Sequence, residues 1–201
     1  MADIVKSRDT EGKKTADNLR SLVKTTNKRF KTSILSPLTI TLGDEFQAVI
    51  KDITSSIGII LFIEELCIRQ KAGFKLRYVL VNGEIETPIN EKIAYGMLGE
   101  GLTRARETIN KLKKSEERFS FPTGKNEEVL NNLFVLYQSF IDEWKPRDSK
   151  IITDFIDFDD YKIVAEKNKK DISLMWKRKR SLKIKEYKTV KKLINEYPGG
   201  K

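Results

Sequence analysis

The chain has 201 residues, and 39% of them are hydrophobic, so it can bury the core of one large domain or two small ones. It contains no histidine and a single cysteine, which excludes Ser-His and Cys-His nucleophiles, most zinc sites and an internal disulfide. Lysine and arginine number 39 against 29 acidic residues, giving a net charge of +10. Such an excess is typical of proteins that bind nucleic acid or an acidic membrane surface.

The apolar runs are too short to cross a bilayer. The best candidate, residues 57–63, is ended by Glu64 and Glu65, well short of the roughly 18 apolar residues that a membrane span needs. The N-terminal residues lack the basic and apolar regions of a secretion signal. We therefore expect a cytoplasmic protein that does not bind membranes.

The first half of the chain alternates strand and helix signals. In chain order they predict a strand at 2–5, a helix at 13–30, strands at 37–42 and 46–50, a helix at 53–71, a strand at 76–81, a helix at 102–112 and a strand at 119–121. The order β-α-β-β-α-β-α-β is the plan of a ferredoxin-like or palm sheet with helices on one face.

Past Gly124 the pattern becomes helical, and the next glycine is Gly199. We expect one helix at 127–144 and a cluster of helices from Asp159 onward. The sequence thus predicts an α+β protein with a ferredoxin-like or palm domain at 1–124 and a small all-helical domain at 125–201.

Acidic residues occur at two of the predicted strands in the first half, where they could bind a metal ion. Gly43, Asp44 and Glu45 separate two strand signals, and glycine allows the positive φ of a hairpin turn. Asp3 lies in the first strand. Carboxylates at the tips of two strands can hold Mg²⁺, so Asp3, Asp44 and Glu45 are candidate metal ligands. An ordinary solvated turn is the alternative explanation of the hairpin acids.

Arginine can add bidentate contacts to the phosphates of a metal-bound nucleotide. The candidates for these contacts are Arg8, Arg104 and Arg106.

The C-terminal part carries most of the net positive charge. Residues 159–201 contain 14 lysines and arginines against 6 acids. Asp159 and Asp160 can cap one helix, and Asp171 can cap a second at 172–184 after a break at 168–170. Two short helices around such a tight turn predict a helix-turn-helix. Lys169 replaces the usual turn glycine, and Asn168 replaces the usual apolar anchor.

The side chains of the second helix divide between an inward apolar face and an outward basic face. Ile172, Met175, Trp176 and Leu182 are expected to face inward, which leaves no broad exposed apolar face and makes a membrane surface the second choice of partner. The candidate DNA-contacting residues are Lys169, Lys170, Ser173, Lys177, Arg178, Arg180 and Lys185. A solvated lysine face that docks another partner is the alternative.

Several motifs together resemble the SatD family of bacterial proteins. They are the runs 3–8, 36–47, 83–85, 99–106 and 176–187, and the most specific is Leu-Gly-Asp-Glu-Phe-Gln at 42–47. The resemblance covers nearly the whole chain.

The N-terminal motifs are also similar, more distantly, to class III nucleotidyl cyclases. That resemblance implies that Asp3 and Asp44 hold the metal, that the carbonyl of Ile4 assists, and that two copies can dimerise. The helix at 102–112 departs from the cyclase pattern, because Thr103 replaces an asparagine and Arg106 lies one residue early.

These departures favour a sensor over an enzyme. The sequence therefore predicts a DNA-binding regulatory protein of the SatD type, with a degenerate cyclase-like domain that senses a nucleotide with Mg²⁺. An active cyclase that makes a cyclic nucleotide from ATP or GTP is the alternative. We expect a homodimer that associates through the palm or through the helix at 127–144.

Overall fold

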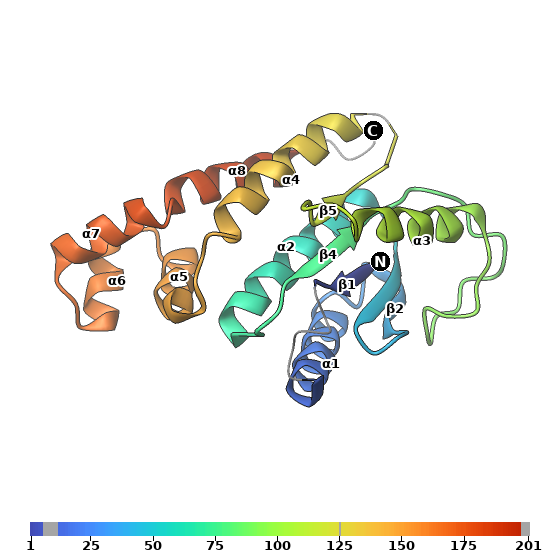
Figure 1. The fold of residues 1–201 in the computed structure, drawn as a ribbon, viewed down its shortest axis with the longest axis horizontal. Helices are drawn as coiled ribbons and strands as arrows, with labels where there is room; N and C mark the ends of the chain where they lie inside the picture. The colour runs from blue at the N-terminus through green and yellow to red at the C-terminus, as the bar shows by residue number, and fades with distance from the viewer. Residues whose placement is uncertain (6–11, 125, 198–201) are drawn as a thin grey trace.

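The computed structural model describes residues 1–5, 12–124 and 126–197, and Figure 1 shows their arrangement. The elements of the first half are β1 (Ala2–Ile4), α1 (Gly12–Arg29), β2 (Ile34–Ile40), β3 (Glu45–Ile50), α2 (Ile53–Gln70), β4 (Leu76–Val79), α3 (Glu100–Leu112) and β5 (Phe119–Ser120). The second half contains α4 (Glu127–Ile141), the short 3-10 helix η2 (Pro146–Asp148), α5 (Ser149–Asp157), α6 (Tyr161–Asn168), α7 (Ile172–Ser181) and α8 (Ile184–Glu196). The predicted order of strands and helices in the first half is confirmed, and the protein is α+β.

The five strands form one mixed sheet in the order β2-β3-β1-β4-β5. β1 lies between β3 and β4 and is antiparallel to both, while β5 is parallel to β4. The register places Asp3 opposite Glu45 on one side and opposite Arg77 on the other. Residues directly opposite in antiparallel strands share a face, so these three side chains lie on the same side of the sheet.

The hairpin between β2 and β3 forms as predicted. Gly43 has a φ of 80°, which a glycine adopts without steric cost. Pro37 lies inside β2, where it cannot donate a hydrogen bond, and the pairing with β3 shifts register once before Pro37 and once across it. β2 is an edge strand, the position in a sheet that tolerates proline.

Both ends of helix α2 are capped. The side chain of Asp52 accepts a hydrogen bond from the backbone N–H of Ser55 at 2.6 Å, and Lys71 ends the helix in a left-handed conformation with a φ of 50°.

None of the helices in the described part of the chain has the length and apolar content needed to span a bilayer.

The sheet carries helices on both faces, so the expectation of helices on one face was wrong. Neighbouring residues of a strand point to opposite faces. Tyr78 of β4 joins the main core with α1 and α2, while Val79 packs with Ala105 and Ile109 of α3. Figure 1 shows α3 crossing the sheet apart from the other helices.

The main core crosses the expected boundary at 124–125. Phe134 and Tyr137 of α4, with Tyr187 of α8, are buried in the same cluster as the sheet. A second core joins α5, α6 and α7, and its buried residues are Ile152, Phe155, Val164, Ala165, Met175, Leu182 and Ile184. The division at 124–125 stays a prediction.

Helix α5 was not expected from the sequence, although Ile152, Phe155 and Ile156 have helical spacing. The helix is only nine residues long, and such a short periodic segment gives a weak signal.

Three glycines allow two backbones to touch. A Cβ on Gly83 would come within 2.7 Å of the Cα of Gly101, and one on Gly101 within 2.9 Å of the carbonyl carbon of Gly83. Gly99 has a φ of 154°, and its Cβ would meet the carbonyl oxygen of Glu84 at 2.6 Å. The N–H of Gly101 donates to that same oxygen at 3.1 Å. The runs 83–85 and 99–101 therefore anchor the start of α3 to the segment after β4.

We expect Gly101→Ala to lower the free energy of unfolding by about 1–3 kcal/mol, because the added methyl group would overlap backbone atoms that cannot rotate away. Gly58→Ala is the matched control. Gly58 lies inside α2 with no atom within 4 Å of its Cβ position, so alanine should raise stability by about 0.5–1 kcal/mol. Urea unfolding of both variants measures the difference, and equal effects would contradict the close packing of these backbones.

Candidate functional site

Five charged side chains gather on the face of the sheet that α3 covers, and we name them the sheet-face cluster: Asp3, Glu45, Arg77, Arg106 and Lys113. Arg77 Nη1 lies 3.5 Å from Asp3 Oδ1, and Lys113 Nζ lies 3.3 Å from Asp3 Oδ2. Arg106 Nη1 donates to Glu45 Oε2 at 2.5 Å. The side chains of Asp3 and Glu45 are 4% and 1% exposed. The cluster is a buried set of acids, each paired with a cation.

Asp3 is held in an unfavourable environment for a carboxylate. Burial raises its pKa above the ordinary value, and Arg77 and Lys113 oppose this shift. Within the described residues, Asp3 Oδ1 is a buried atom without a hydrogen-bond partner. Buried polar atoms are usually satisfied, so this oxygen is a point where the cluster could accept a further donor.

The acids do not assemble as a metal site. Among residues 1–5, 12–124 and 126–197, no three acidic, histidine or cysteine side chains are grouped to hold a metal ion. Asp3 and Glu45 share a face, but each already faces a cation. Asp44 is half-buried, and its backbone carbonyl accepts from the N–H of Ile4 at 3.0 Å. The arrangement does not fit Mg²⁺ held by Asp3, Asp44 and Glu45 together, and magnesium binding stays a prediction.

Two of the three candidate phosphate ligands, Arg104 and Arg106, lie on α3 in the described part of the chain. Arg106 is engaged with Glu45, and Arg104 is exposed on α3. Arg8 lies outside the described residues. Nucleotide binding and cyclisation therefore stay predictions.

The second candidate site is the pair of helices α6 and α7 with the turn between them, which we name the basic hairpin. Asp160 and Asp171 cap the two helices as predicted. Lys169 is left-handed, with a φ of 50°, at the position where the sequence lacks the usual glycine. Asn168 Nδ2 donates to Asp154 Oδ2 at 2.8 Å, so a hydrogen bond to α5 replaces the missing apolar anchor.

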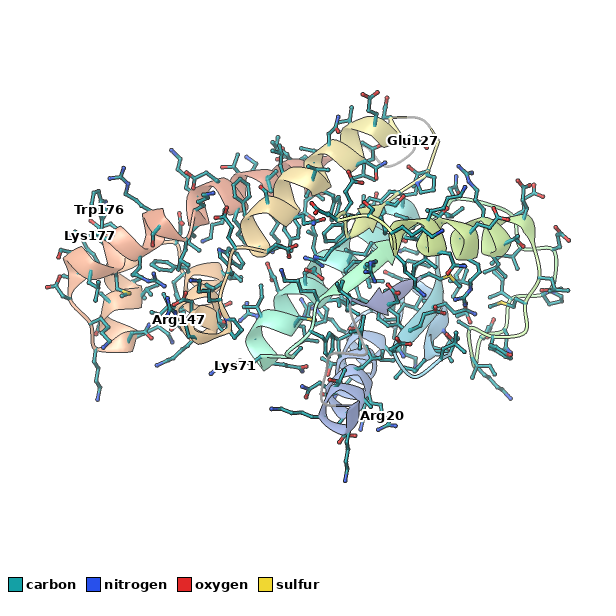
Figure 2. All side chains as sticks on the ribbon, viewed as in Figure 1. Arg20, Lys71, Glu127, Arg147, Trp176 and Lys177 are labelled. Carbon is teal, nitrogen blue, oxygen red and sulfur yellow. The ribbon has the colours of Figure 1, made fainter. Side chains whose placement is uncertain are left out.

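Two of the residues expected to face inward on α7 are exposed, so that part of the prediction was wrong. Met175 and Leu182 are buried, but Ile172 is 51% exposed and Trp176 is 43% exposed. The helix ends at Ser181 instead of continuing to residue 184, because Lys183 adopts a left-handed conformation that begins α8. Figure 2 shows Trp176 and Lys177 projecting at one end of the molecule.

The basic side chains of this region divide into two groups. Ion pairs within the fold engage Arg178 with Asp148 at 2.6 Å, and both Lys179 and Lys188 with Asp159. The candidates that lie exposed to solvent are Lys169, Lys170, Ser173, Lys177, Arg180 and Lys185. The guanidinium of Arg180 lies over the ring of Trp176 at 4.9 Å. The ion pair between Arg178 and Asp148 connects the basic hairpin to η2.

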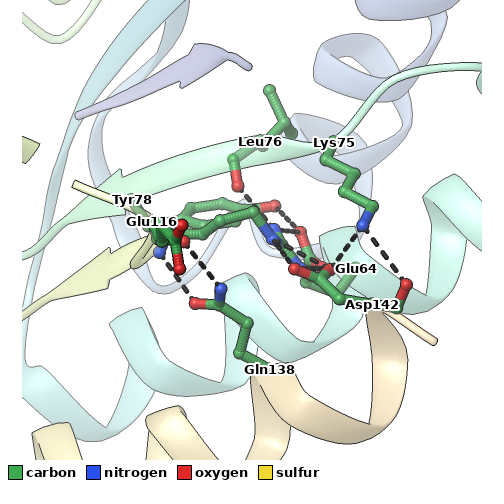
Figure 3. Close-up of polar contacts among 8 residues, drawn as sticks. Glu64, Lys75, Leu76, Tyr78, Glu116, Gln138 and Asp142 are labelled. Carbon is green, nitrogen blue, oxygen red and sulfur yellow. Dashed lines mark hydrogen bonds and ion pairs between the residues drawn. The ribbon is translucent and has the colours of Figure 1, made fainter. Parts of the chain in front are cut away.

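A third polar group, missed in the sequence, joins the two halves of the chain (Figure 3). Arg118 donates to Glu64 of α2 through Nη2 at 2.9 Å and to both carboxylate oxygens of Asp142, the residue after α4. Tyr78 Oη donates to Glu64 at 2.8 Å, and Lys75 Nζ lies 3.1 Å from Asp142. We name these five residues the junction network.

The junction network alters the titration of its own members. Burial alone would lower the pKa of Arg118, but Glu64 and Asp142 raise it above the ordinary value. Burial and Glu64 together raise the pKa of Tyr78 well above that of a free tyrosine. One signal could have revealed the network. Glu64 follows Ile57, Ile60 and Leu61 on the apolar stripe of α2, where an acid needs a partner.

Comparison with known proteins adds one firm result. The model of the SatD family matches residues 1–197. The chain belongs to the SatD family. No curated protein and no solved structure matches it. SatD membership confirms the resemblance found in the sequence motifs, while the cyclase and helix-turn-helix interpretations stay predictions.

The raised pKa of Asp3 predicts how the stability of this SatD protein depends on pH. Between the ordinary aspartate pKa of about 4 and the raised value, the folded state binds more protons than the unfolded state. Stability should therefore fall as pH rises through this interval. Relative to the wild type, Asp3→Asn should gain unfolding free energy over the same interval and keep that gain at higher pH.

Asp52→Asn is the matched control with the opposite sign. The hydrogen bond from the backbone N–H of Ser55 lowers the pKa of Asp52. The unfolding free energy of the wild type relative to this variant should therefore increase as pH rises. Urea unfolding across the acidic and neutral range measures both differences. If Asp3→Asn instead loses unfolding free energy relative to the wild type as pH rises, the ion pairs with Arg77 and Lys113 outweigh the energetic cost of burying the carboxylate.

Proposed function

We propose that this SatD-family protein binds DNA through the basic hairpin and that its α+β part regulates that binding. The observation that carries the proposal is the surface of α7. Ser173, Lys177 and Arg180 are exposed at helical spacing i, i+4, i+7, while Met175 and Leu182 on the other side of the helix are buried. A helix fixed by its apolar side and solvent-exposed on its basic side suits insertion into a major groove.

The exposed apolar residues fit the same surface. Ile172 and Trp176 lie at i, i+4 beside the basic stripe, and the ring of Trp176 holds the guanidinium of Arg180. Apolar side chains in a recognition helix can contact thymine methyl groups, while arginine and lysine reach phosphates and guanine edges. Lys169 and Lys170, in the turn before α7, would contact the phosphate backbone.

A solvated lysine face is the alternative, and the ion pairs of this region separate the cations that hold the fold together from those available to a ligand. The fold uses Arg178, Lys179 and Lys188 in pairs with acids of neighbouring elements. Lys169, Lys170 and Lys177 are exposed, and Figure 2 shows Lys177 at one end of the molecule. We infer that these exposed cations serve a polyanion.

Binding by a single hairpin gives modest specificity, and we propose that two copies associate through α4. Val129, Leu133, Leu136 and Phe140 follow a 4-3-4 spacing, which is the seam pattern of helix-helix packing. Val129 is 54% exposed and Leu136 is 52% exposed. A second copy of the chain, with the same stripe, would cover this surface and bring two hairpins to one DNA duplex.

The double variant Lys177→Glu, Arg180→Glu tests the DNA interface. Each phosphate that a cation neutralises contributes about −0.9 to the slope of log affinity against log salt. We expect the variant to bind a labelled duplex more weakly and with a slope that is less steep by about 2. Fluorescence anisotropy at several salt concentrations measures both quantities, and selection of genomic fragments shows which sequences the wild type prefers.

Lys24→Glu, Lys28→Glu is the matched control, because both lysines are exposed on α1, away from the hairpin. It makes the same change in net charge and should keep nearly wild-type affinity. Equal losses in the two double variants, or tighter binding to anionic lipid vesicles than to DNA, would refute the proposal.

Leu136→Glu tests the dimer. A charge in the centre of an apolar stripe should prevent association, and sedimentation velocity over a range of protein concentrations measures it. Val135→Glu makes a comparable change at a residue that is 47% exposed and lies off the stripe, and it should leave the dimer intact. A wild type that stays monomeric at every concentration would exclude this interface.

A further inference from the structure

A cavity of about 510 Å³ lies between the end of α2, the start of β4 and the segment that runs from α4 to α5. Small-molecule sites typically occupy about 300–1,000 Å³ and occur preferentially where two parts of a fold meet. We name this space the junction cavity. Its apolar walls are formed by Cys67, Ile68, Phe74, Ile141, Trp144 and Ile152.

Four members of the junction network line the junction cavity: Glu64, Lys75, Arg118 and Asp142. Glu64 and Asp142 both line it, but Arg118 pairs with each of them and Lys75 pairs with Asp142 as well. The acids are therefore neutralised by cations that belong to the fold. They leave no unpaired negative charge to attract a cation.

Two further cations line the cavity. Lys71 lies at the end of α2 and Lys145 just before η2, and both are exposed. Figure 2 shows Lys71 at the end of its helix. Lys75 is partly exposed as well. Apolar walls combined with exposed ammonium groups are complementary to an anion that carries an apolar body.

We propose that the junction cavity binds a small organic anion, with an apolar body against Trp144 and Ile152 and a carboxylate or phosphate head at Lys71 and Lys145. The site is separate from the sheet-face cluster, and it does not depend on DNA binding. The apolar walls provide most of the buried area, and the lysines select against neutral molecules of the same shape.

The two tryptophans of the chain make the site measurable. Trp144 lines the cavity and donates through Nε1 to the carbonyl of Leu182 at 2.9 Å, whereas Trp176 is exposed on α7. In Trp176→Phe, Trp144 is the remaining tryptophan. Decanoate, decyl phosphate and decanol, each below its micelle-forming concentration, are titrated while Trp144 fluorescence is recorded. We expect saturable changes with one or both anions and weaker binding of decanol.

Lys71→Gln, Lys145→Gln in the same background should weaken binding of the preferred anion by about three- to tenfold and leave decanol unchanged. Lys24→Gln, Lys28→Gln on α1 is the control for net charge and should bind like the parent. The proposal is overturned if neither anion binds, if decanol binds as tightly as the anions, or if both double variants lose affinity equally. Unfolding curves of all variants confirm that the fold is retained.

Discussion

The buried guanidinium of Arg118 is the constraint on which the relative placement of the main elements depends. Its side chain is 5% exposed, and it bonds Glu64 of α2, the carbonyl of Leu76 in β4 and Asp142 after α4. It also lies 4.9 Å from the ring centre of Phe119, the first residue of β5. Loss of one partner of a buried ion pair commonly costs about 3–5 kcal/mol, because the other charge stays in the interior. Sheet, α2 and α4 are therefore held together by one side chain whose donors are all directed at groups of the fold.

Aromatic packing also connects the sheet to α4 and α8. Phe119 and Phe134 lie 4.9 Å apart, and Tyr137, Tyr187 and Trp144 continue the contact from α4 to α8. Tilted and edge-on rings at these distances add to the burial of their large surfaces. This continuity explains why the sheet and the first and last helices of the second half share one core, while the basic hairpin has its own.

The basic hairpin packs on α5 through the second apolar core, and polar contacts connect α5 and the end of α7 to the rest of the fold. Arg69 at the end of α2 forms a bidentate pair with Asp157 of α5, and Trp144 donates to Leu182 at the end of α7. The junction cavity lies among these same elements. A molecule bound there would touch both α2 and the segment leading to α5, so its occupancy would bear directly on how the hairpin is held. This is the physical link between the proposed anion site and the proposed DNA surface.

The sequence by itself determined the family and the order of the elements in the first half, because both depend on local sequence patterns. Turn chemistry at Gly43, the caps at Asp52, Asp160 and Asp171, and the periodic apolar residues depend on neighbours within a few positions of the chain. The same reasoning singled out Asp3 and Glu45, and they do share one face of the sheet.

What only the tertiary structure decided concerns partners that are distant in sequence. Asp3 meets Lys113, Glu64 meets Arg118 and Arg178 meets Asp148, and none of these contacts follows from spacing. The burial of a helix face depends on which other helix covers it, so Ile172 and Trp176 could match an inward pattern and still be exposed. Charge could be counted from the sequence, but only the fold separated the cations that hold the structure together from those that face solvent.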